Sequence, residues 1–274
     1  MNIDLNINTE LVRKILTGFI RSEVTRVGFQ RAIVGLSGGI DSAVSCALAA
    51  EALGAENVLA VRMPYKSSSP DSLEDAEKTA ACLKVRMETI EITAMVDPLI
   101  DREPGLSHLR KGNLMARARM IVLYDQSEVF KGLVIGTSNK TEILLGYTTM
   151  WGDMASALNP VGDLYKTQLR QLAAALQIPR SVLEKPPSAD LWAGQTDEAE
   201  LGLTYAEVDR LLYLLVDQRY TPEDCVEAGF ERAFVDKVLT RVRRNQFKRM
   251  MPPIAKLSNR TIGYDFLYLR DWGT

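Results

Sequence analysis

The chain has 274 residues and a formal net charge of −2 at pH 7; 46% of its residues are hydrophobic and 25% are charged. This composition is typical of a globular protein with a full hydrophobic core, and the near-zero charge excludes a bulk positive field that would attract nucleic acid. No apolar run approaches the roughly 20 residues that span a bilayer, so we expect no membrane partner.

The three cysteines and the single histidine narrow the possible chemistry. Cys46, Cys82 and Cys225 are irregularly spaced and each lies in an apolar helical context, which indicates reduced core thiols. His108 alone cannot supply a His-rich zinc site, and Ser-His-Asp catalysis is nearly excluded. The first six residues lack the basic and apolar regions of a signal peptide, so we expect a cytoplasmic protein.

Helices and short apolar strands are predicted to alternate along the chain. Thr9 is expected to cap a first helix, whose apolar positions are Leu11, Val12, Ile15, Leu16, Phe19 and Ile20. The next predicted elements are strands at residues 32–34, 58–61, 85–92 and 133–136 and helices at residues 43–50, 71–83 and 113–130. This order favours a Rossmann-like α/β fold, in which helices cover both faces of a parallel sheet. Residues 166–246 are predicted to be mainly helical, and we expect one domain over residues 1–274.

The segment Gly35-Leu36-Ser37-Gly38-Gly39-Ile40-Asp41-Ser42 joins a predicted strand to a predicted helix. Such a turn points backbone N–H groups and the positive end of a helix at an anion, and adjacent glycines leave room for a phosphate. Ser37 and Ser42 add hydroxyl donors. Asp41 would repel a phosphate unless a divalent cation lies between them. The segment therefore predicts a phosphate site that also holds Mg²⁺.

A tight turn that is capped by serine or aspartate and binds nothing is the alternative interpretation of this segment. Two glycines, two serines and an acid within six residues make that alternative the less favoured one. The segment lacks the spacing of a Walker loop and that of a dinucleotide-binding fold. It resembles the Ser-Gly-Gly-x-Asp-Ser loop of ATP pyrophosphatases, which implies that it holds the pyrophosphate released from ATP.

A second polar cluster, residues 136–142, follows the last predicted strand. We expect Thr137 to open a helix there and Glu142 to lie about one and a half turns further on. A lone glutamate on a helix is normally exposed to solvent, but beside a segment that calls for a metal it becomes a candidate Mg²⁺ ligand. Lys166 is predicted to begin another helix, where the helix dipole disfavours a cation. A nearby anion such as a polyphosphate would explain that lysine.

Two loops lie beside the predicted site. Residues 63–70 connect a predicted strand to a helix through small polar residues, and residues 101–112 are polar and contain Pro104 and Gly105. They are either ordinary surface loops or lids that close over ATP and exclude water.

Several stretches, in order along nearly the whole chain, resemble ammonia-dependent NAD synthetases. Besides residues 35–42 and 136–142, they are residues 113–117, 162–167, 185–192, 195–198 and 256–261. The resemblance implies an adenine nucleotide alpha hydrolase-like fold and the amidation of deamido-NAD to NAD by ammonia. ATP is the implied co-substrate, the carboxylate is adenylated, and AMP and pyrophosphate are released. The resemblance also implies a homodimer in which the dinucleotide lies across the subunit interface.

The resemblance assigns roles to individual residues. Asp41 and Glu142 are the implied Mg²⁺ ligands, and Asp41 and Lys166 are the catalytic candidates. The implied ATP contacts are Gly35, Leu36, Ser37, Gly38, Gly39, Ile40, Asp41, Ser42, Thr137, Lys166 and Ser188. Such a reaction needs alignment of the substrates and neutralisation of pyrophosphate charge, and it needs no protein nucleophile.

Two positions depart from the family pattern. Met150 stands where many members have a lysine, and Ala157 stands where many have an acid; both family residues contact deamido-NAD. The substrate must then be held through other groups, with Arg117, Asp153 and Lys248 as the nearest candidates.

Two other classes of protein share the phosphate loop. Enzymes that thiolate tRNA or form lysidine would show a basic face, an added RNA-binding domain or a Cys-x-x-Cys pair. The basic stretch of Arg241, Arg243, Arg244, Lys248 and Arg249 is interpreted as a solvated helix face, of which Lys248 alone could reach a substrate phosphate. A non-catalytic nucleotide sensor would not need Glu142, Lys166 and Ser188 together. No glutaminase segment is evident, so free ammonia or ammonia from a separate protein is the expected nitrogen source.

Overall fold

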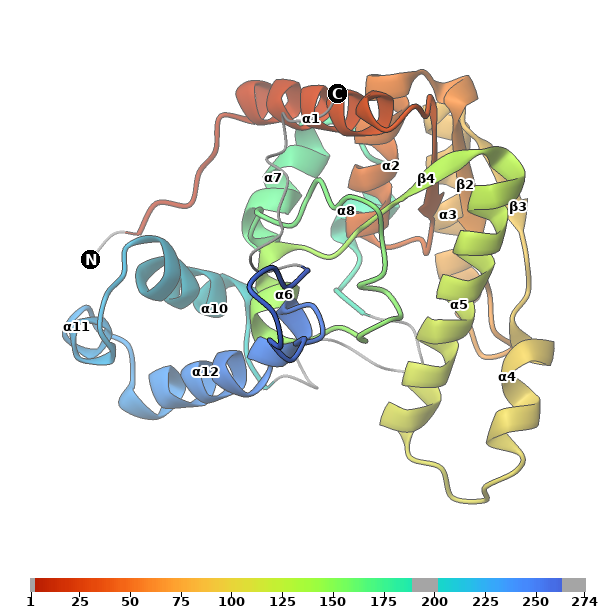
Figure 1. Ribbon diagram of the computed structural model, residues 1–274. Helices are drawn as coiled ribbons and strands as arrows, with labels where there is room; N and C mark the ends of the chain where they lie inside the picture. The colour runs from red at the N-terminus through yellow and green to blue at the C-terminus, as the bar shows by residue number, and fades with distance from the viewer. Residues whose placement is uncertain (1–2, 189–201, 263–274) are drawn as a thin grey trace.

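The computed structural model describes residues 3–188 and 202–262 (Figure 1). Four parallel strands form a sheet in the order β3-β2-β1-β4. The strands are β1 (Arg31–Gly35), β2 (Val58–Arg62), β3 (Arg86–Thr89) and β4 (Gly132–Ile135). The chain builds outward from β1 to β3 and then crosses to the other side of β1 to form β4. The boundary between β1 and β4 is therefore the switch point at which open α/β sheets bind ligands, beyond the carboxyl ends of the strands.

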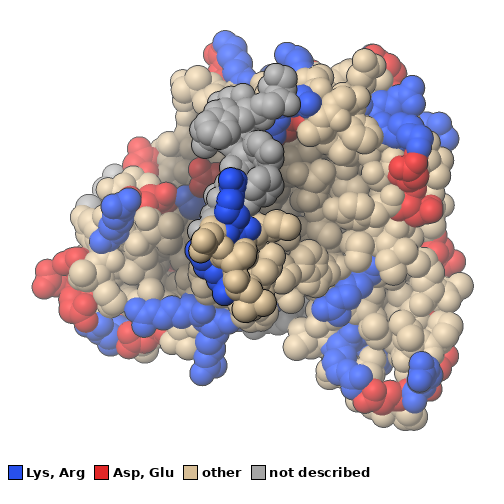
Figure 2. Space-filling view, viewed as in Figure 1, with Lys and Arg blue, Asp and Glu red and all other residues tan. Residues whose placement is uncertain are grey.

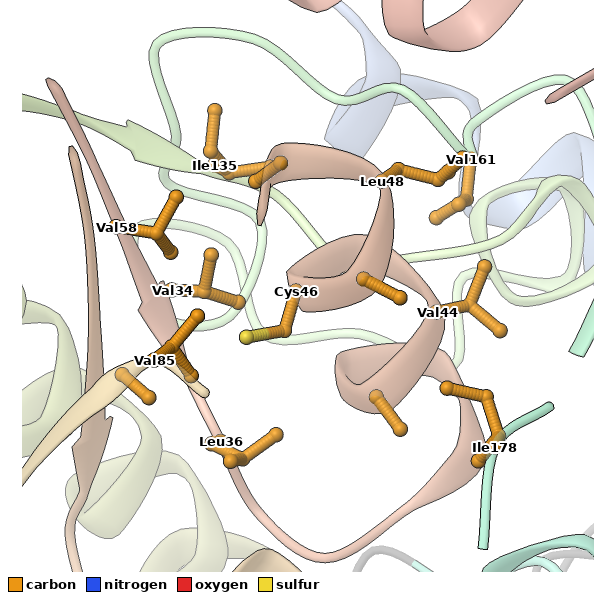
Figure 3. Packing of buried hydrophobic residues seen from close by; sticks show 14 of the residues in the cluster. Val34, Leu36, Val44, Cys46, Leu48, Val58, Val85, Ile135, Val161 and Ile178 are labelled. Atoms are coloured by element: carbon orange, nitrogen blue, oxygen red, sulfur yellow. The ribbon is translucent and has the colours of Figure 1, made fainter. Parts of the chain in front are cut away.

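Helices cover both faces of this sheet. The cluster on one face includes α1 (Thr9–Arg26), α2 (Ile40–Leu53), α3 (Pro70–Leu83), α7 (Lys166–Ala175) and α8 (Arg180–Glu184). The cluster on the other face includes α4 (Thr93–Ile100) and α5 (His108–Phe130). Successive β1 residues point to opposite faces, so Val34 packs in the first cluster and Ile33 in the second. In Figure 3, Cys46 of α2 points toward Val34 of β1 and toward Val85.

A third group of helices has its own hydrophobic cluster. It consists of α6 (Lys140–Leu145), α10 (Tyr205–Leu212), a π-helical segment (Tyr213–Asp217), α11 (Pro222–Glu227) and α12 (Arg232–Arg244). Two short 3₁₀ turns, Ala55–Asn57 and Gln246–Arg249, complete the described elements. Figure 1 shows α10, α11 and α12 gathered on the side of α6 and α7 that faces away from α5. Within the described ranges, no helix is long and apolar enough to cross a membrane.

The predicted α/β architecture with a parallel sheet is confirmed, and the differences are local. The cap of α1 is Asn8 and not Thr9, because the Asn8 side chain accepts a hydrogen bond from Leu11 N at 3.0 Å. The predicted strand at residues 85–92 is shorter, and α5 begins five residues earlier than predicted, after a Ser107 cap. The helix α4 was not predicted. Cys82 is exposed on α3, so the prediction of a core thiol was wrong there, whereas Cys46 and Cys225 are buried.

Candidate functional site

The loop between β1 and α2 is shaped by its glycines and serines. Gly38 has φ +82°, and a Cβ at this position would lie 2.1 Å from the carbonyl oxygen of Ser72 in α3. Only glycine fits there, because both the backbone conformation and the space exclude a side chain. The Ser37 and Ser42 hydroxyls lie 3.1 Å apart, and Ser42 Oγ donates to Gly39 O at 2.9 Å. Gly39 precedes α2 without a side-chain cap, so the helix N-terminus can receive an anion.

The connection after β4 differs from its prediction. Thr137 does not open a helix; it lies in the connection, and α6 begins at Lys140. Asn139 is the cap, because its side chain accepts a hydrogen bond from Glu142 N at 3.0 Å while Glu142 Oε2 accepts from Asn139 N at 3.3 Å. This reciprocal capping box fixes the Glu142 side chain at the start of α6.

Lys166 joins the two loops in a single cluster of charged side chains. Its ammonium donates to Asp41 Oδ2 at 2.5 Å and to Glu142 Oε1 at 3.2 Å. The buried amide of Asn139 donates to the other Asp41 oxygen at 2.8 Å. The Lys166 side chain is 2% exposed, against 18% for Asp41 and 15% for Glu142. The carboxylates therefore close over a buried cation and retain a small opening to solvent.

A second layer of polar residues lies behind Lys166. Asp209 of α10 is fully buried and accepts hydrogen bonds from Thr141 Oγ1 at 2.6 Å and from Thr167 N at 2.8 Å. The Thr141 hydroxyl in turn accepts from Lys166 N at 3.0 Å. Burial raises the pKa of Asp209, and the hydrogen bonds from the two threonines oppose that rise. The Lys166 ammonium also lies 5.2 Å from the centre of the Tyr205 ring.

The cluster has the donor set of a Mg²⁺ site. Mg²⁺ is usually held by one or two carboxylates together with substrate phosphates and water. Asp41 and Glu142 supply two carboxylates that converge on one cation, the Lys166 ammonium. Over residues 3–188 and 202–262, no group of three or more His, Cys, Asp or Glu side chains is arranged to hold a metal. Two carboxylates at one place fit the donor set of a metal that is shared with phosphates.

Two further predicted ATP residues lie in other connections: Thr137 between β4 and α6, and Ser188 after α8. Thr137 and Ser188 are both half-buried. Just before Ser188, Lys185 donates to Ser72 Oγ at 2.9 Å and pairs with Asp75 at 3.2 Å. These two contacts hold the residues before Ser188 against the N-terminal part of α3, where Ser72 packs on Gly38. Residues 189–192 and 195–198, which carry the rest of the family resemblance in this region, lie outside the described residues.

The predicted deamido-NAD residues are spread over three elements. Arg117 is exposed on α5. Met150 is half-buried in a turn with Asp153, whose carboxylate accepts a hydrogen bond from Thr149 N at 2.5 Å. Ala157 is exposed beside β4, where its N–H donates to Val134 O at 2.9 Å. Lys248 donates from Nζ to the carbonyls of Gly146 and Thr148, at 2.7 and 2.8 Å.

The basic stretch does not form the solvated helix face that we predicted. Arg241 and Lys248 donate to carbonyls at the end of α6, and so does Arg249, which reaches Leu144 O at 2.9 Å. These carbonyls have no partner within the helix, and cations complement the negative end of its dipole. Only Arg243 and Arg244 are exposed as predicted. The three other cations therefore hold the C-terminal end of α6, while Asn139 and Glu142 define its other end.

The loop at residues 63–70 is attached to the start of α4. Tyr65 Oη and Lys66 Nζ both donate to the Asp97 carboxylate, each at 2.6 Å, and Lys66 N donates to Thr93 Oγ1 at 3.0 Å. In the other loop, residues 108–112 belong to α5.

Comparisons with known proteins add to this geometry. The family model described as NAD synthase matches residues 12–252. An NH(3)-dependent NAD(+) synthetase from Trichlorobacter lovleyi is 57% identical over 269 residues, which cover 98% of both chains. Among solved structures, an NMN synthetase from Francisella tularensis aligns with a TM-score of 0.80 at 30% identity, covering 91% of this chain and 99% of that one. An NH3-dependent NAD synthetase from Campylobacter jejuni aligns with a TM-score of 0.78 at 33% identity, covering 91% of this chain and 100% of that one.

Proposed function

Since this chain belongs to the NAD synthase family and catalyses ammonia-dependent NAD synthesis, we propose that the carboxylate of deamido-NAD is activated at the cluster of Asp41, Glu142 and Lys166. The observation that carries this proposal is the Lys166 ammonium, which is buried between two carboxylates at the switch point of the sheet. A carbon–nitrogen ligase that uses ATP needs a place where cations and a triphosphate meet, and this cluster supplies its protein part.

The chain's own groups are suited to bind and align the triphosphate. The first N–H groups of α2 and the hydroxyls of Ser37 and Ser42 can donate to phosphate oxygens. Lys166 can turn its ammonium from the carboxylates toward a phosphate, because a long side chain needs only a rotamer change for that. Asp41 and Glu142 would hold Mg²⁺, which neutralises charge on the phosphates when it is bound.

The chemistry then consists of two displacements at positioned groups. A carboxylate oxygen of deamido-NAD attacks the α-phosphorus of ATP, and the bond to the pyrophosphate oxygen breaks. The ammonia nitrogen next attacks the activated carbonyl carbon, AMP leaves with the bridging oxygen, and nitrogen loses a proton to give the amide. No protein nucleophile is required. Of the described thiols, Cys46 is a residue of α2 that lies in the core, and burial raises its pKa to about 12, so it is no candidate.

The dinucleotide site is proposed to be completed by a second copy of the chain. Ile121 and Tyr124 are large exposed apolar residues on α5, with 54% and 43% of their surface accessible. Arg117 lies one turn before Ile121, so the three residues share one face of the helix. Figure 2 shows that the surface over the middle of α5 is mostly uncharged. A homodimer that buries this face would bring Arg117 of each subunit into the interface, as a dinucleotide shared between subunits requires.

An RNA substrate is disfavoured by the basic residues themselves. Three of the five cations in the basic stretch donate to carbonyls at the C-terminal end of α6 or just after it, so they do not form an open phosphate-binding surface. A cytoplasmic location is consistent with Cys46 and Cys225, which are free thiols in the core.

Pyrophosphate release tests the proposal directly. We expect release from ATP only when deamido-NAD is present, and conversion to NAD only when ammonium is added as well. Nicotinic acid mononucleotide is the matched comparison substrate, because one structural relative is an NMN synthetase. Asp41→Asn should lower kcat by roughly 10²-fold, since one metal contact contributes several kcal/mol. Asp71→Asn, an exposed first-turn acid of α3, is the control. Wild-type turnover in the Asp41 variant at saturating Mg²⁺ would show that the assignment is wrong.

A further inference from the structure

Two carboxylates outside the cluster each connect the start of α6 to the start of α7. They belong to Asp209 on α10 and to Asp217 at the end of the π-helical segment. We propose that Asp209 and Asp217 are positioning residues, which hold α6 and α7 at the separation that places Glu142 and Lys166 together. This inference rests on the proposed roles of Glu142 and Lys166.

Asp209 connects the residues next to both site residues. Its Oδ1 accepts from the hydroxyl of Thr141, the neighbour of Glu142, and its Oδ2 accepts from the N–H of Thr167, the neighbour of Lys166. The Thr141 hydroxyl also receives the N–H of Lys166, so one buried carboxylate and one hydroxyl join the two backbones. Asp209 is fully buried, and a carboxylate in that position is stabilised by such hydrogen bonds.

Asp217 makes the same kind of connection on the other side. Its Oδ1 receives the ammonium of Lys140, the first residue of α6, at 2.7 Å. Its Oδ2 receives the hydroxyl of Tyr165, the residue before Lys166, at 2.5 Å. The Lys140 ammonium also lies 4.7 Å from the centre of the Tyr165 ring, which adds a cation–π contact between the same two helix ends.

The π-helical segment explains how one stretch of chain presents both acids to the same helix ends. Asp217 lies eight positions after Asp209, and in an α-helix its side chain would be rotated by about 80° beyond two full turns from that of Asp209. A π turn contains more residues than an α turn, so Tyr213–Asp217 reduces that excess and brings the second acid toward the face of the first. Such segments are frequent at functional sites, and here the segment serves to aim a side chain.

The shortness of α6 gives these contacts their importance. The helix has six residues, and a helix of that length does not persist without tertiary contacts. Its C-terminal end is held by Arg241, Lys248 and Arg249, and its N-terminal end by the two acids. Without the acids, the N-terminal turn that carries Glu142 would lose the hydrogen bonds that Lys140 and Thr141 make to the π-helical segment and to α10.

The test compares Asp209→Asn and Asp217→Asn with a control on the same helix. Glu207→Gln changes an exposed acid of α10 that bonds only to Thr204 in the described structure. We expect each Asp variant to lower kcat for pyrophosphate release by roughly 10-fold to 100-fold, because small displacements of reacting groups have effects of that size. The KM for ammonium should change by less than about 2-fold, since no step of ammonia binding involves these groups. The control should keep the wild-type kcat.

A double-mutant cycle separates positioning from a loss of stability. In a Glu142→Gln background, Asp209→Asn should lower kcat by less than about 3-fold further, because the pairing of Glu142 with Lys166 that Asp209 maintains is already altered. Equal effects in both backgrounds, measured well below each variant's Tm, would overturn the proposal. If Asp209→Asn does not fold, Thr141→Val removes the shared hydroxyl and keeps the shape of the side chain, and the same cycle applies.

Parallel measurements distinguish this inference from the proposed site. Glu142→Gln and Lys166→Met are assayed alone. Wild-type turnover in either one would overturn its proposed role in the reaction. If both lose activity while Asp209→Asn and Asp217→Asn keep it, the site stands and the positioning role fails.

Discussion

Lys166 Nζ lies 2.5 Å from Asp41 Oδ2, although 125 positions separate the two residues in the sequence. The ammonium lies between the two carboxylates that we propose as ligands of a divalent cation. If that proposal is right, binding of the metal and phosphates exchanges the pairing of Lys166 with these acids for contacts to phosphates. This exchange has consequences for stability that can be measured without substrate.

Lys166→Met is expected to destabilise the free protein and to make its stability respond to Mg²⁺. Removing one partner of a buried ion pair costs about 3 kcal/mol, because the remaining charges are left without a counter-ion. A metal that binds only the folded state restores stability in proportion to its occupancy. The Tm of this variant should rise more with added Mg²⁺ than the Tm of the wild type.

Lys185→Met is the matched control for that measurement. Lys185 also pairs with a buried acid, Asp75, but at a distance of 3.2 Å and outside the cluster. Lys185→Met should lower the Tm, but added Mg²⁺ should raise the Tm of this variant by the same amount as that of the wild type. Equal responses to Mg²⁺ in all three proteins would contradict the exchange of Lys166 for a metal.

Gly38→Ala is expected to disturb the phosphate loop more than a positive φ alone can explain. Gly28 has the same φ of +82°, but no atom lies within 4 Å of a Cβ built there, whereas a Cβ on Gly38 would meet Ser72 O at 2.1 Å. Gly28→Ala should therefore report the conformational cost alone, roughly 1–2 kcal/mol. Gly38→Ala should exceed that value in urea unfolding and should also raise the KM for ATP. Equal effects of the two variants on both quantities would mean that α3 does not pack on the loop as described.

Ile121→Glu is expected to separate a homodimer into inactive monomers. A charge placed on the exposed face of α5 would have to be buried without a partner in a stable interface, which is strongly unfavourable. Ile15→Glu on α1 is the matched control, because Ile15 and Ile121 are exposed to a similar degree, 57% and 54%. Sedimentation velocity and NAD formation should be measured on the same samples. If Ile15→Glu separates the dimer and Ile121→Glu does not, the interface lies on α1.

The parallel sheet is the feature that sequence patterns predicted best. Short β-branched strands alternating with helices specify a sheet buried on both faces. The carboxyl ends of neighbouring parallel strands must then meet at one edge, which is why Asp41 after β1 and Glu142 after β4 converge. The proximity of Asp41 and Glu142 therefore follows from the predicted strands and from the rule that parallel strands end at the same edge of a sheet.

Local sequence patterns did not predict where α6 begins or which distant residues hold the site residues in place. Thr137 was expected to open a helix, but the helix begins after Asn139. The reason is that the Asn139 side chain accepts from the backbone of Glu142 while the Glu142 side chain accepts from the backbone of Asn139. Asp209 is 68 residues from Thr141, and nothing in its own segment marks it as different from an exposed helical acid. Arg249 looked like a surface cation, because the carbonyls that it binds belong to α6, about 105 residues earlier. Contacts between distant segments of this kind are visible only once the helices are packed.

Met150 and Ala157 are the two positions that we interpret as departures from the family pattern. Met150 is half-buried in a turn, and Ala157 is exposed next to β4. Met150→Lys alone would place a cation in a turn whose acid, Asp153, already accepts a hydrogen bond from Thr149 N, and it should raise the KM for deamido-NAD. Adding Ala157→Asp should recover part of the loss, because a charge-assisted hydrogen bond is worth roughly 1.5–3 kcal/mol. Ala157→Asn, which adds similar volume without charge, should not recover it. A double-mutant cycle on the KM for deamido-NAD measures the coupling between the two positions. Strictly additive effects would show that they are not coupled.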